Sequence, residues 1–203
     1  MSISAEDRER ISLAIRSAET KTSGEIVCVL AQSSSDAKAL PIFIAALVAL
    51  ALPWLLVALT AMPVQRIFLL QILVFVALTV LLCLPRVRVA LMPRAARRAV
   101  AHRVAMEQFV IRGLTRKKDR TGILIFVSLA ERYARIVADD GIAARVPQPE
   151  WRGAVDALVV HMHDGRVADG FISAIDICAT ILATHFPHTE TSRDELPDRV
   201  YVI

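Results

Sequence analysis

Cysteine is scarce in this chain: its 203 residues include three, Cys28, Cys83 and Cys178. Because these form neither an even set nor a close pair, the sequence predicts no disulfide framework and no zinc site, and a reducing compartment suits them. Charged residues make up only 22% of the chain and hydrophobic residues 55%. This balance excludes a disordered, collagen-like or coiled-coil chain and favours a membrane protein.

Charge is absent altogether from two long stretches, 27 residues between Lys38 and Arg66 and 19 residues between Arg66 and Arg86. A helix of about 20 apolar residues is long enough to cross the hydrocarbon core of a bilayer. We therefore expect two transmembrane helices, at about residues 41–62 and 67–84. The turn between them is so short that they form an antiparallel hairpin, which places both ends of the chain on one side of the membrane.

The distribution of basic residues predicts which side that is. The turn carries only Arg66, whereas residues 86–120 carry 11 Lys and Arg against 2 Asp and Glu. Since Lys and Arg near helix ends resist translocation, both termini are expected in the cytoplasm and the hairpin in the inner (cytoplasmic) membrane. The N-terminus opens with a charged stretch, so no signal peptide is expected.

The basic segment after the hairpin has two readings. Beside a membrane it can bind anionic lipid headgroups, through Arg86, Arg88, Arg94, Arg97 and Arg98. The alternative is a topology signal that has no ligand. Nucleic acid is not expected as a partner, because no aromatic residues are interleaved with the arginines.

The rest of the chain alternates helical and extended patterns. Apolar residues at helical spacing predict four further helices, over about residues 5–20, 93–113, 149–163 and 167–186. Runs of β-branched and apolar residues predict three strands, at 25–31, 121–129 and 133–138. The last two strands are close enough to form an antiparallel hairpin. Helices that alternate with strands predict an α/β domain with helices covering a small mixed sheet.

The membrane hairpin interrupts this domain after its first strand. The expected organisation is a first helix and strand in residues 1–38, the hairpin in 41–85, the remainder of the domain in 86–187 and a polar tail in 188–203. Because the hairpin returns the chain to the side it left, the two parts of the domain can rejoin in one sheet.

Four carboxylates are predicted at one edge of that sheet. If the first two strands are parallel, as a right-handed crossover requires, the start of the first, the start of the second and the end of the third share an edge. The side chains there are Glu25, Asp119, Asp139 and Asp140. They offer oxygen ligands for calcium, or for magnesium with a phosphate. The alternative is that Arg120 and Arg132 neutralise them as ordinary turn residues.

Known catalytic motifs are otherwise missing. The chain has no Walker A sequence, no G-x-S-x-G and no H-E-x-x-H. His161 and His163 lie two apart on a predicted helix and so face different directions, which favours polar surface over metal ligation. Cys28 and Cys178 lie in apolar elements, where a cysteine ordinarily serves as a small hydrophobic residue.

Several strand and turn motifs occur together in this chain: TSGEIVCVL (22–30), DRTGILIFVSLAER (119–132), IVADDGI (136–142), Trp151, DGRVADG (164–170) and the pair Phe186-Pro187. In this combination the sequence resembles the TPM domain family of thylakoid-lumen, photosystem-repair and receptor-accessory proteins. The resemblance covers residues 1–38 and 86–187. It implies a Rossmann-like αβα sandwich, here interrupted by the two-helix transmembrane hairpin.

The resemblance also implies two kinds of function. Some members are credited with acid phosphatase activity or calcium binding, and others act as non-catalytic partners of membrane complexes. Members commonly have an Asp-Asn-Gly step before the second strand, where this chain has Asp119, Arg120, Thr121 and Gly122. That difference replaces an amide ligand with a cation.

Two functional hypotheses follow. The first is a membrane-anchored cytoplasmic accessory module that assists the assembly or stability of another membrane protein. It rests on the predicted anchor, the resemblance and the missing nucleophile. The alternative is a calcium- or magnesium-dependent phosphatase that acts on a phosphate ester through the carboxylate edge.

Overall fold

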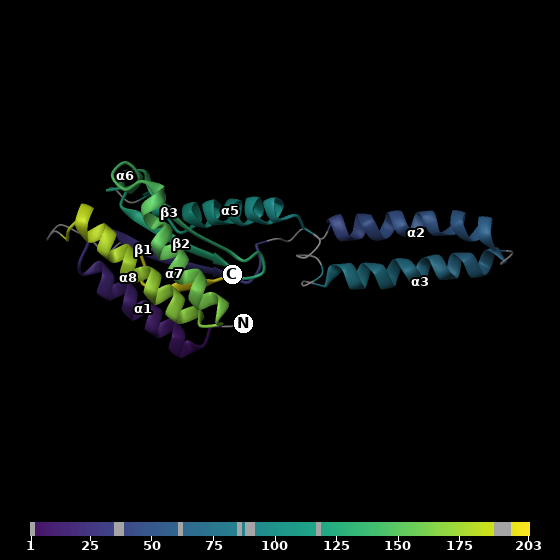
Figure 1. Ribbon diagram of the computed structural model, residues 1–203, viewed down its shortest axis with the longest axis horizontal. Helices are drawn as coiled ribbons and strands as arrows, with labels where there is room; N and C mark the ends of the chain where they lie inside the picture. The colour runs from purple at the N-terminus through teal and green to yellow at the C-terminus, as the bar shows by residue number, and fades with distance from the viewer. Residues whose placement is uncertain are drawn as a thin grey trace. The chain divides into compact units, whose positions relative to one another are not determined.

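One mixed β-sheet organises the part of the chain outside the long apolar helices (Figure 1). The computed structural model describes residues 3–34, 39–60, 63–84, 87, 92–116, 119–188 and 196–203. Among them the strand order is β3-β2-β1-β4. β1 (Glu25–Ala31) and β2 (Gly122–Ser128) pair in parallel, and β3 (Tyr133–Ala138) pairs antiparallel with β2. Both strand directions agree with the prediction from sequence.

The central position of β1 and β2 explains their composition. Every residue of both strands is buried. A strand that is covered on both faces cannot alternate apolar and polar residues, so it becomes a continuous apolar run. β3 lies at the edge of the sheet and is only partly buried, and it carries polar residues such as Arg135.

The fourth strand was missed by the sequence analysis, which assigned residues 188–203 to a polar tail. β4 (Val200–Val202) pairs in parallel with Cys28–Leu30. Backbone hydrogen bonds extend the pairing, since Ile203 N donates to Leu30 O at 3.0 Å and Gln32 N donates to Ile203 O at 2.9 Å. A three-residue strand is too short to show a period in the sequence, and its stability comes from partners more than 160 residues away.

Three helices cover one face of the sheet: α1 (Ala5–Glu19), α7 (Arg152–His163) and α8 (Val167–His185). The core beneath them includes Ile11, Ile15, Trp151 and Phe171, which are almost wholly buried. Two short elements, α6 (Asp140–Ala143) and the 3-10 helix η2 (Gln148–Trp151), lead from β3 into α7. The helices are amphipathic because only one side of each contacts the sheet.

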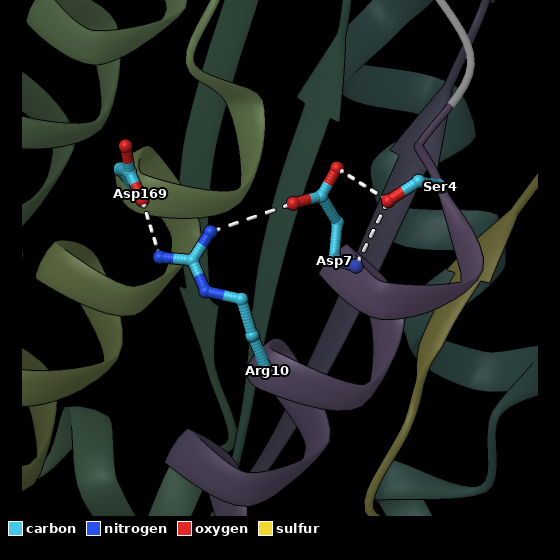
Figure 2. A network of polar contacts seen from close by, with 4 residues as sticks. All are labelled: Ser4, Asp7, Arg10 and Asp169. Carbon is cyan, nitrogen blue, oxygen red and sulfur yellow. Dashed lines mark hydrogen bonds and ion pairs between the residues drawn. The ribbon is translucent and has the colours of Figure 1, made fainter.

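Polar contacts at the start of α1 fasten it to α8. Ser4 caps the helix, with Asp7 N donating to Ser4 Oγ at 3.0 Å. Figure 2 shows Arg10 reaching from α1 toward both Asp7 and Asp169, at 3.4 Å and 2.7 Å. A helix was predicted over about residues 5–20, and the serine just before it supplies the cap that the first turn of a helix needs.

The opposite face of the sheet is covered by α5 (Arg94–Ile111) and the 3-10 helix η1 (Leu114–Arg116). Ala101, Ala105 and Phe109 of α5 form a second apolar cluster with Val27 and Phe126 of the sheet. Gly113 follows α5 with φ +81°, the left-handed conformation that ends a helix without steric cost for glycine. Helices on both faces of a mixed sheet confirm the α/β class.

Residues 35–97 form a second compact unit, separate from the unit made of residues 1–34 and 98–203. Within it α2 (Ala39–Leu59) and α3 (Val64–Cys83) lie side by side (Figure 1). α2 is helical on both sides of Pro53. Many of their large apolar side chains are exposed, including Trp54, which is 82% exposed.

In the described part of the chain, three helices have the length and composition needed to cross a membrane: Pro41–Leu59, Val64–Cys83 and Val167–His185. Half of the third is buried inside the structure, against about a tenth or less of the first two. α8 is apolar on one side because it packs on α1, α7 and the sheet.

Candidate functional site

The predicted carboxylate edge exists as an arrangement of strand ends. Glu25 begins β1 opposite Gly122, the first residue of β2, and Glu25 N donates to Thr121 O at 3.0 Å. Asp139 follows β3, and its backbone N donates to Gly122 O at 2.9 Å. Glu25 and Asp139 are each only 3% exposed. The parallel crossover therefore brings both residues to one edge, as the strand directions predicted.

Arg120 forms the principal ion pair at this edge. Its Nη1 lies 3.3 Å from Asp139 Oδ1 and 3.7 Å from Asp140 Oδ2. Arg120 has φ +52°, in the left-handed region that non-glycine residues seldom adopt. A Cβ atom added to Gly141 would lie only 2.6 Å from the carbonyl oxygen of Arg120. The loop before β2 and the turn after β3 are therefore in close contact. The predicted alternative, neutralisation by arginine, holds here for Arg120.

Arg132 does not take part in this neutralisation. It directly precedes β3, whereas Asp139 directly follows it, so the six residues of the strand separate them by about 20 Å of extended chain. Like Arg120, it has a positive φ, of 51°. It lies in the turn between β2 and β3, where Arg132 N donates to Leu129 O at 3.3 Å.

Asp139 has a second role that accounts for one of its oxygens. It caps α6, and Oδ1 accepts from the backbone N–H of Asp140 at 2.8 Å. Oδ2 is buried and has no hydrogen-bond partner among the described residues. The residue is thus held by its neighbours through one oxygen only.

The four carboxylates do not fit a divalent cation as they are arranged here. Glu25 and Asp139 are buried, whereas Asp119 is exposed and the side chain of Asp140 is 93% exposed. No group of three or more His, Cys, Asp or Glu residues gathers at metal-binding distances within the described ranges. Calcium takes six to eight oxygen ligands, and a guanidinium already approaches Asp139. The calcium or magnesium site stays a prediction.

A second polar cluster, missed by the sequence analysis, lies where β1 and β2 end. Glu131 is 5% exposed and accepts from Ser33 Oγ at 3.1 Å and from Ser34 N at 3.0 Å. Ser128 Oγ also donates to Glu131, and Ser34 Oγ donates to Ser128 Oγ at 2.9 Å. The run of serines after the first strand is a signal in the sequence, but no local pattern pairs those serines with a glutamate in the turn between the second and third strands.

Hydrogen bonding controls the charge of this buried carboxylate. Burial raises the pKa of Glu131, but the hydrogen bonds from Ser128, Ser34 and Ser33 stabilise the ionised form and together hold the pKa below its ordinary value. A carboxylate with a lowered pKa is a weak base. The cluster therefore serves better to fasten Ser34, which lies just before α2 in the chain, than to activate a serine.

The remaining candidate residues have structural contacts. His161 Nδ1 lies 2.9 Å from Ala157 O within its own helix. Cys28 and Cys178 are buried free thiols, and burial raises the pKa of both well above the ordinary range. Since the thiolate is the reactive form, these cysteines are inert packing residues, as the sequence predicted.

Comparisons with known proteins identify the domain. The family model of the TPM domain matches residues 85–181, which include α5, β2, β3, α7 and most of α8. The fold is similar to the NMR structure of the BA42 protein from the psychrophilic bacterium Bizionia argentinensis sp. nov.. The TM-score is 0.63 at 20% identity, and the alignment covers 100% of this chain and 97% of that one. A search of curated proteins returned no match.

At 20% identity the structural likeness concerns the fold alone, but the family model recognises the sequence itself. The match also includes Asp119, Asp139 and Asp140, while Glu25 lies outside it. Residues 85–181 thus match the TPM domain in sequence, and the fold of the chain is similar to that of BA42.

Proposed function

We propose that this protein is a membrane-anchored accessory module, whose TPM domain assists the assembly or stability of another membrane protein. The observation that carries the anchor is the exposure of α2 and α3. Trp54, Leu59 and Leu69 are 82%, 72% and 69% exposed. Removing one large apolar side chain from water stabilises a protein by about 1.5–3 kcal/mol, and side chains exposed to water do not gain this free energy. Lipid is therefore the environment that suits these two helices.

The two helices fit an antiparallel transmembrane hairpin. α2 ends at Leu59 and α3 begins at Val64. Helices of 21 and 20 residues are long enough to cross a bilayer. α8 is excluded from this role because its buried face forms the core of the domain and Asp169 lies in its first turn.

With the hairpin in place, the domain is a Rossmann-like αβα sandwich interrupted after its first strand. Residues 1–34 supply α1 and β1, and residues 98–203 supply the other three strands. The two parts rejoin through the seven-residue pairing of β1 with β2. An antiparallel hairpin permits this because it returns the chain to the same side of the bilayer.

The basic segment supports a cytoplasmic location for both termini, in the inner membrane. Arg94, Arg97 and Arg98 lie in the first turns of α5, while Arg86 and Arg88 lie outside the described residues. Lys and Arg near helix ends favour the cytoplasmic side. In that position the arginines bind anionic lipid headgroups, each contributing about 1 kcal/mol near the surface.

The contacts of the buried carboxylates, at the carboxylate edge and in the Glu131 cluster, favour an accessory role over catalysis. Asp139 is engaged by Arg120 and by the α6 cap, and Glu131 is ionised and held by serines. Among the described residues, no serine or cysteine is hydrogen-bonded to a histidine base, the arrangement that activates a nucleophile. A non-catalytic partner of a membrane complex needs neither an activated nucleophile nor a general base.

Membrane fractionation tests the anchor. The full chain is expected to sediment with membranes after an alkaline carbonate wash, and a variant with residues 39–84 replaced by a Gly/Ser linker to be released. Crosslinking in native membranes is then expected to join the full chain to another membrane protein. A full chain that washes off, or that joins no membrane protein, contradicts the proposal.

One observation favours the competing function of a metal-dependent phosphatase: the buried Asp139 Oδ2 has no hydrogen-bond partner in the described part of the chain. A generic phosphate ester assayed with and without calcium or magnesium separates the two functions. Metal-dependent turnover that is lost in Asp139→Asn and kept in Arg8→Gln, an exposed position on α1, would replace the accessory reading.

A further inference from the structure

A hollow of about 540 Å³ lies where α5 and α7 approach the free edge of β3. Its lining includes four basic side chains and contains no acidic one: Arg98 and His102 come from α5, and Arg132 and Arg135 from the β2–β3 turn and β3. Arg98 and His102 are four residues apart on one helix face. The hollow is open because, in the strand order of the described residues, β3 has no neighbour on its other side.

The charges of this hollow have no partners in the described part of the chain. Other arginines of the domain form ion pairs: Arg10, Arg16, Arg120 and Arg166 each lie within 3.4 Å of an aspartate. No such contact exists between the described acids and Arg98, Arg132 or Arg135. Arg135 Nε and His102 Nδ1 are also buried without a hydrogen-bond partner. Buried polar atoms are nearly always satisfied in folded proteins, so these two atoms leave hydrogen-bonding capacity unused beside the unpaired arginines of the hollow.

The fold holds these side chains in place. Arg135 lies on the α5 side of the sheet with Tyr133 and Val137, which pack against that cluster. Arg132 lies in the β2–β3 turn with a positive φ, and its backbone N–H donates to Leu129 O across the turn. The site therefore uses two elements that are fastened to the core, in addition to the basic start of α5.

We propose that this hollow binds a phosphate monoester. Guanidinium groups donate paired hydrogen bonds that match the geometry of phosphate oxygens. Three guanidinium groups suit a ligand with two negative charges, such as a phosphate monoester, better than a ligand with one carboxylate. The adjoining hollow, about 330 Å³, shares Arg132, Tyr133 and Val159 with the first and adds the apolar side chains of Leu129 and Met162. An apolar group attached to the phosphate would occupy it. The ligand class is thus a phosphate monoester of an apolar alcohol.

This site is distinct from the carboxylate edge and does not depend on the membrane anchor. Arg132 and Asp139 flank opposite ends of β3. Only Arg98 is shared with the basic segment proposed to contact lipid. The ligand can come from the bilayer, as a phosphatidic acid headgroup, or from solution, as an alkyl phosphate.

Calorimetry on the full chain in phosphatidylcholine nanodiscs tests the site, with inorganic phosphate and hexyl phosphate as probes. Both are expected to bind, hexyl phosphate more tightly, and binding should weaken as salt is raised. Arg135→Gln and Arg98→Gln should each raise Kd by about tenfold. Arg8→Gln removes the same charge from a distant exposed position and should leave Kd unchanged.

Arg98 is exposed, so its substitution tests the site even if Arg135→Gln disturbs the fold. Absence of binding to the wild-type chain, or equal Kd for wild type and Arg98→Gln, overturns the proposal. In nanodiscs that contain phosphatidic acid, loss of hexyl phosphate binding assigns the ligand to the lipid, and unchanged binding assigns it to solution. Either result leaves the fractionation test of the anchor unaffected.

Discussion

Arg10 of α1 donates to Asp169 of α8 at 2.7 Å, which joins two helices through residues that lie 159 positions apart in the sequence (Figure 2). The hydrogen bond to Arg10 holds the pKa of Asp169 below its ordinary value, and the same bond raises the pKa of Arg10. The pair connects the N-terminal part of the domain, before the long apolar helices, to the part that follows them.

This pair predicts a pH-dependent contribution to stability. A carboxyl group with a lowered pKa stabilises the fold above its unfolded value of about 3.9, and the contribution disappears as pH falls through the folded pKa. Asp169→Asn should therefore lower Tm slightly at pH 7 and progressively less below about pH 4. Thermal unfolding of both chains across pH 3–7 is the measurement. A Tm difference that is the same at every pH would contradict it.

Glu131 predicts a larger effect because it is buried. Glu131→Ala removes the acceptor of Ser33 Oγ and Ser34 N, and leaving a buried donor unsatisfied costs about 1–3 kcal/mol. Glu131→Gln keeps an acceptor oxygen and should cost less. Since the pKa of Glu131 is lowered, the wild-type advantage should shrink as pH falls through that pKa. Chemical denaturation of the three chains checks both points; equal stability of wild type and Glu131→Ala would show that the cluster is unimportant.

The contact between Gly141 and the Arg120 loop predicts a graded series of alanine substitutions. A Cβ at Gly141 would meet the backbone carbonyl of Arg120 at 2.6 Å, which cannot move cheaply, so Gly141→Ala should cost about 1–3 kcal/mol. At Gly122 the obstacle is the end of the Leu114 side chain, at 2.5 Å, and the cost should be smaller. Gly153 has nothing within 4 Å, so Gly153→Ala should be neutral or stabilising by up to about 1 kcal/mol. Urea unfolding midpoints give the order, and a Gly141→Ala chain as stable as Gly153→Ala would refute it.

The topology proposal predicts the behaviour of reporter fusions. A reporter that is active only in the cytoplasm should be active after Ile203 and inactive in the turn at residues 63–65. The reason is the contrast between Arg66 alone on one side and the arginines of α5 on the other. Replacing Arg94, Arg97 and Arg98 by Gln should weaken this preference. A C-terminal reporter active only outside the cytoplasm would reverse the assignment.

Most elements of the domain could be predicted from local patterns. The Ser4 cap, the helical spacing of Ile11 and Ile15 and the apolar run 25–31 each reflect contacts that repeat within one helix or strand. The parallel β1–β2 pair followed from the general handedness of crossovers and needed no knowledge of the particular side chains.

Long-range contacts were beyond such patterns. Val200–Val202 has no period to detect and becomes a strand only because β1 offers a free edge. Glu131 is held by hydrogen bonds from Ser33 and Ser34, which lie nearly a hundred residues earlier in the sequence. Arg120 forms its ion pair with Asp139 where the loop before β2 contacts the turn after β3, and the absence of a side chain at Gly141 permits that contact. The hollow beside β3 likewise collects Arg98 and Arg135 from separate elements. The period and composition of a segment show which of its surfaces avoids water. Which segments then meet depends on the packing of the whole chain, because each long-range contact needs residues from two distant parts of the sequence.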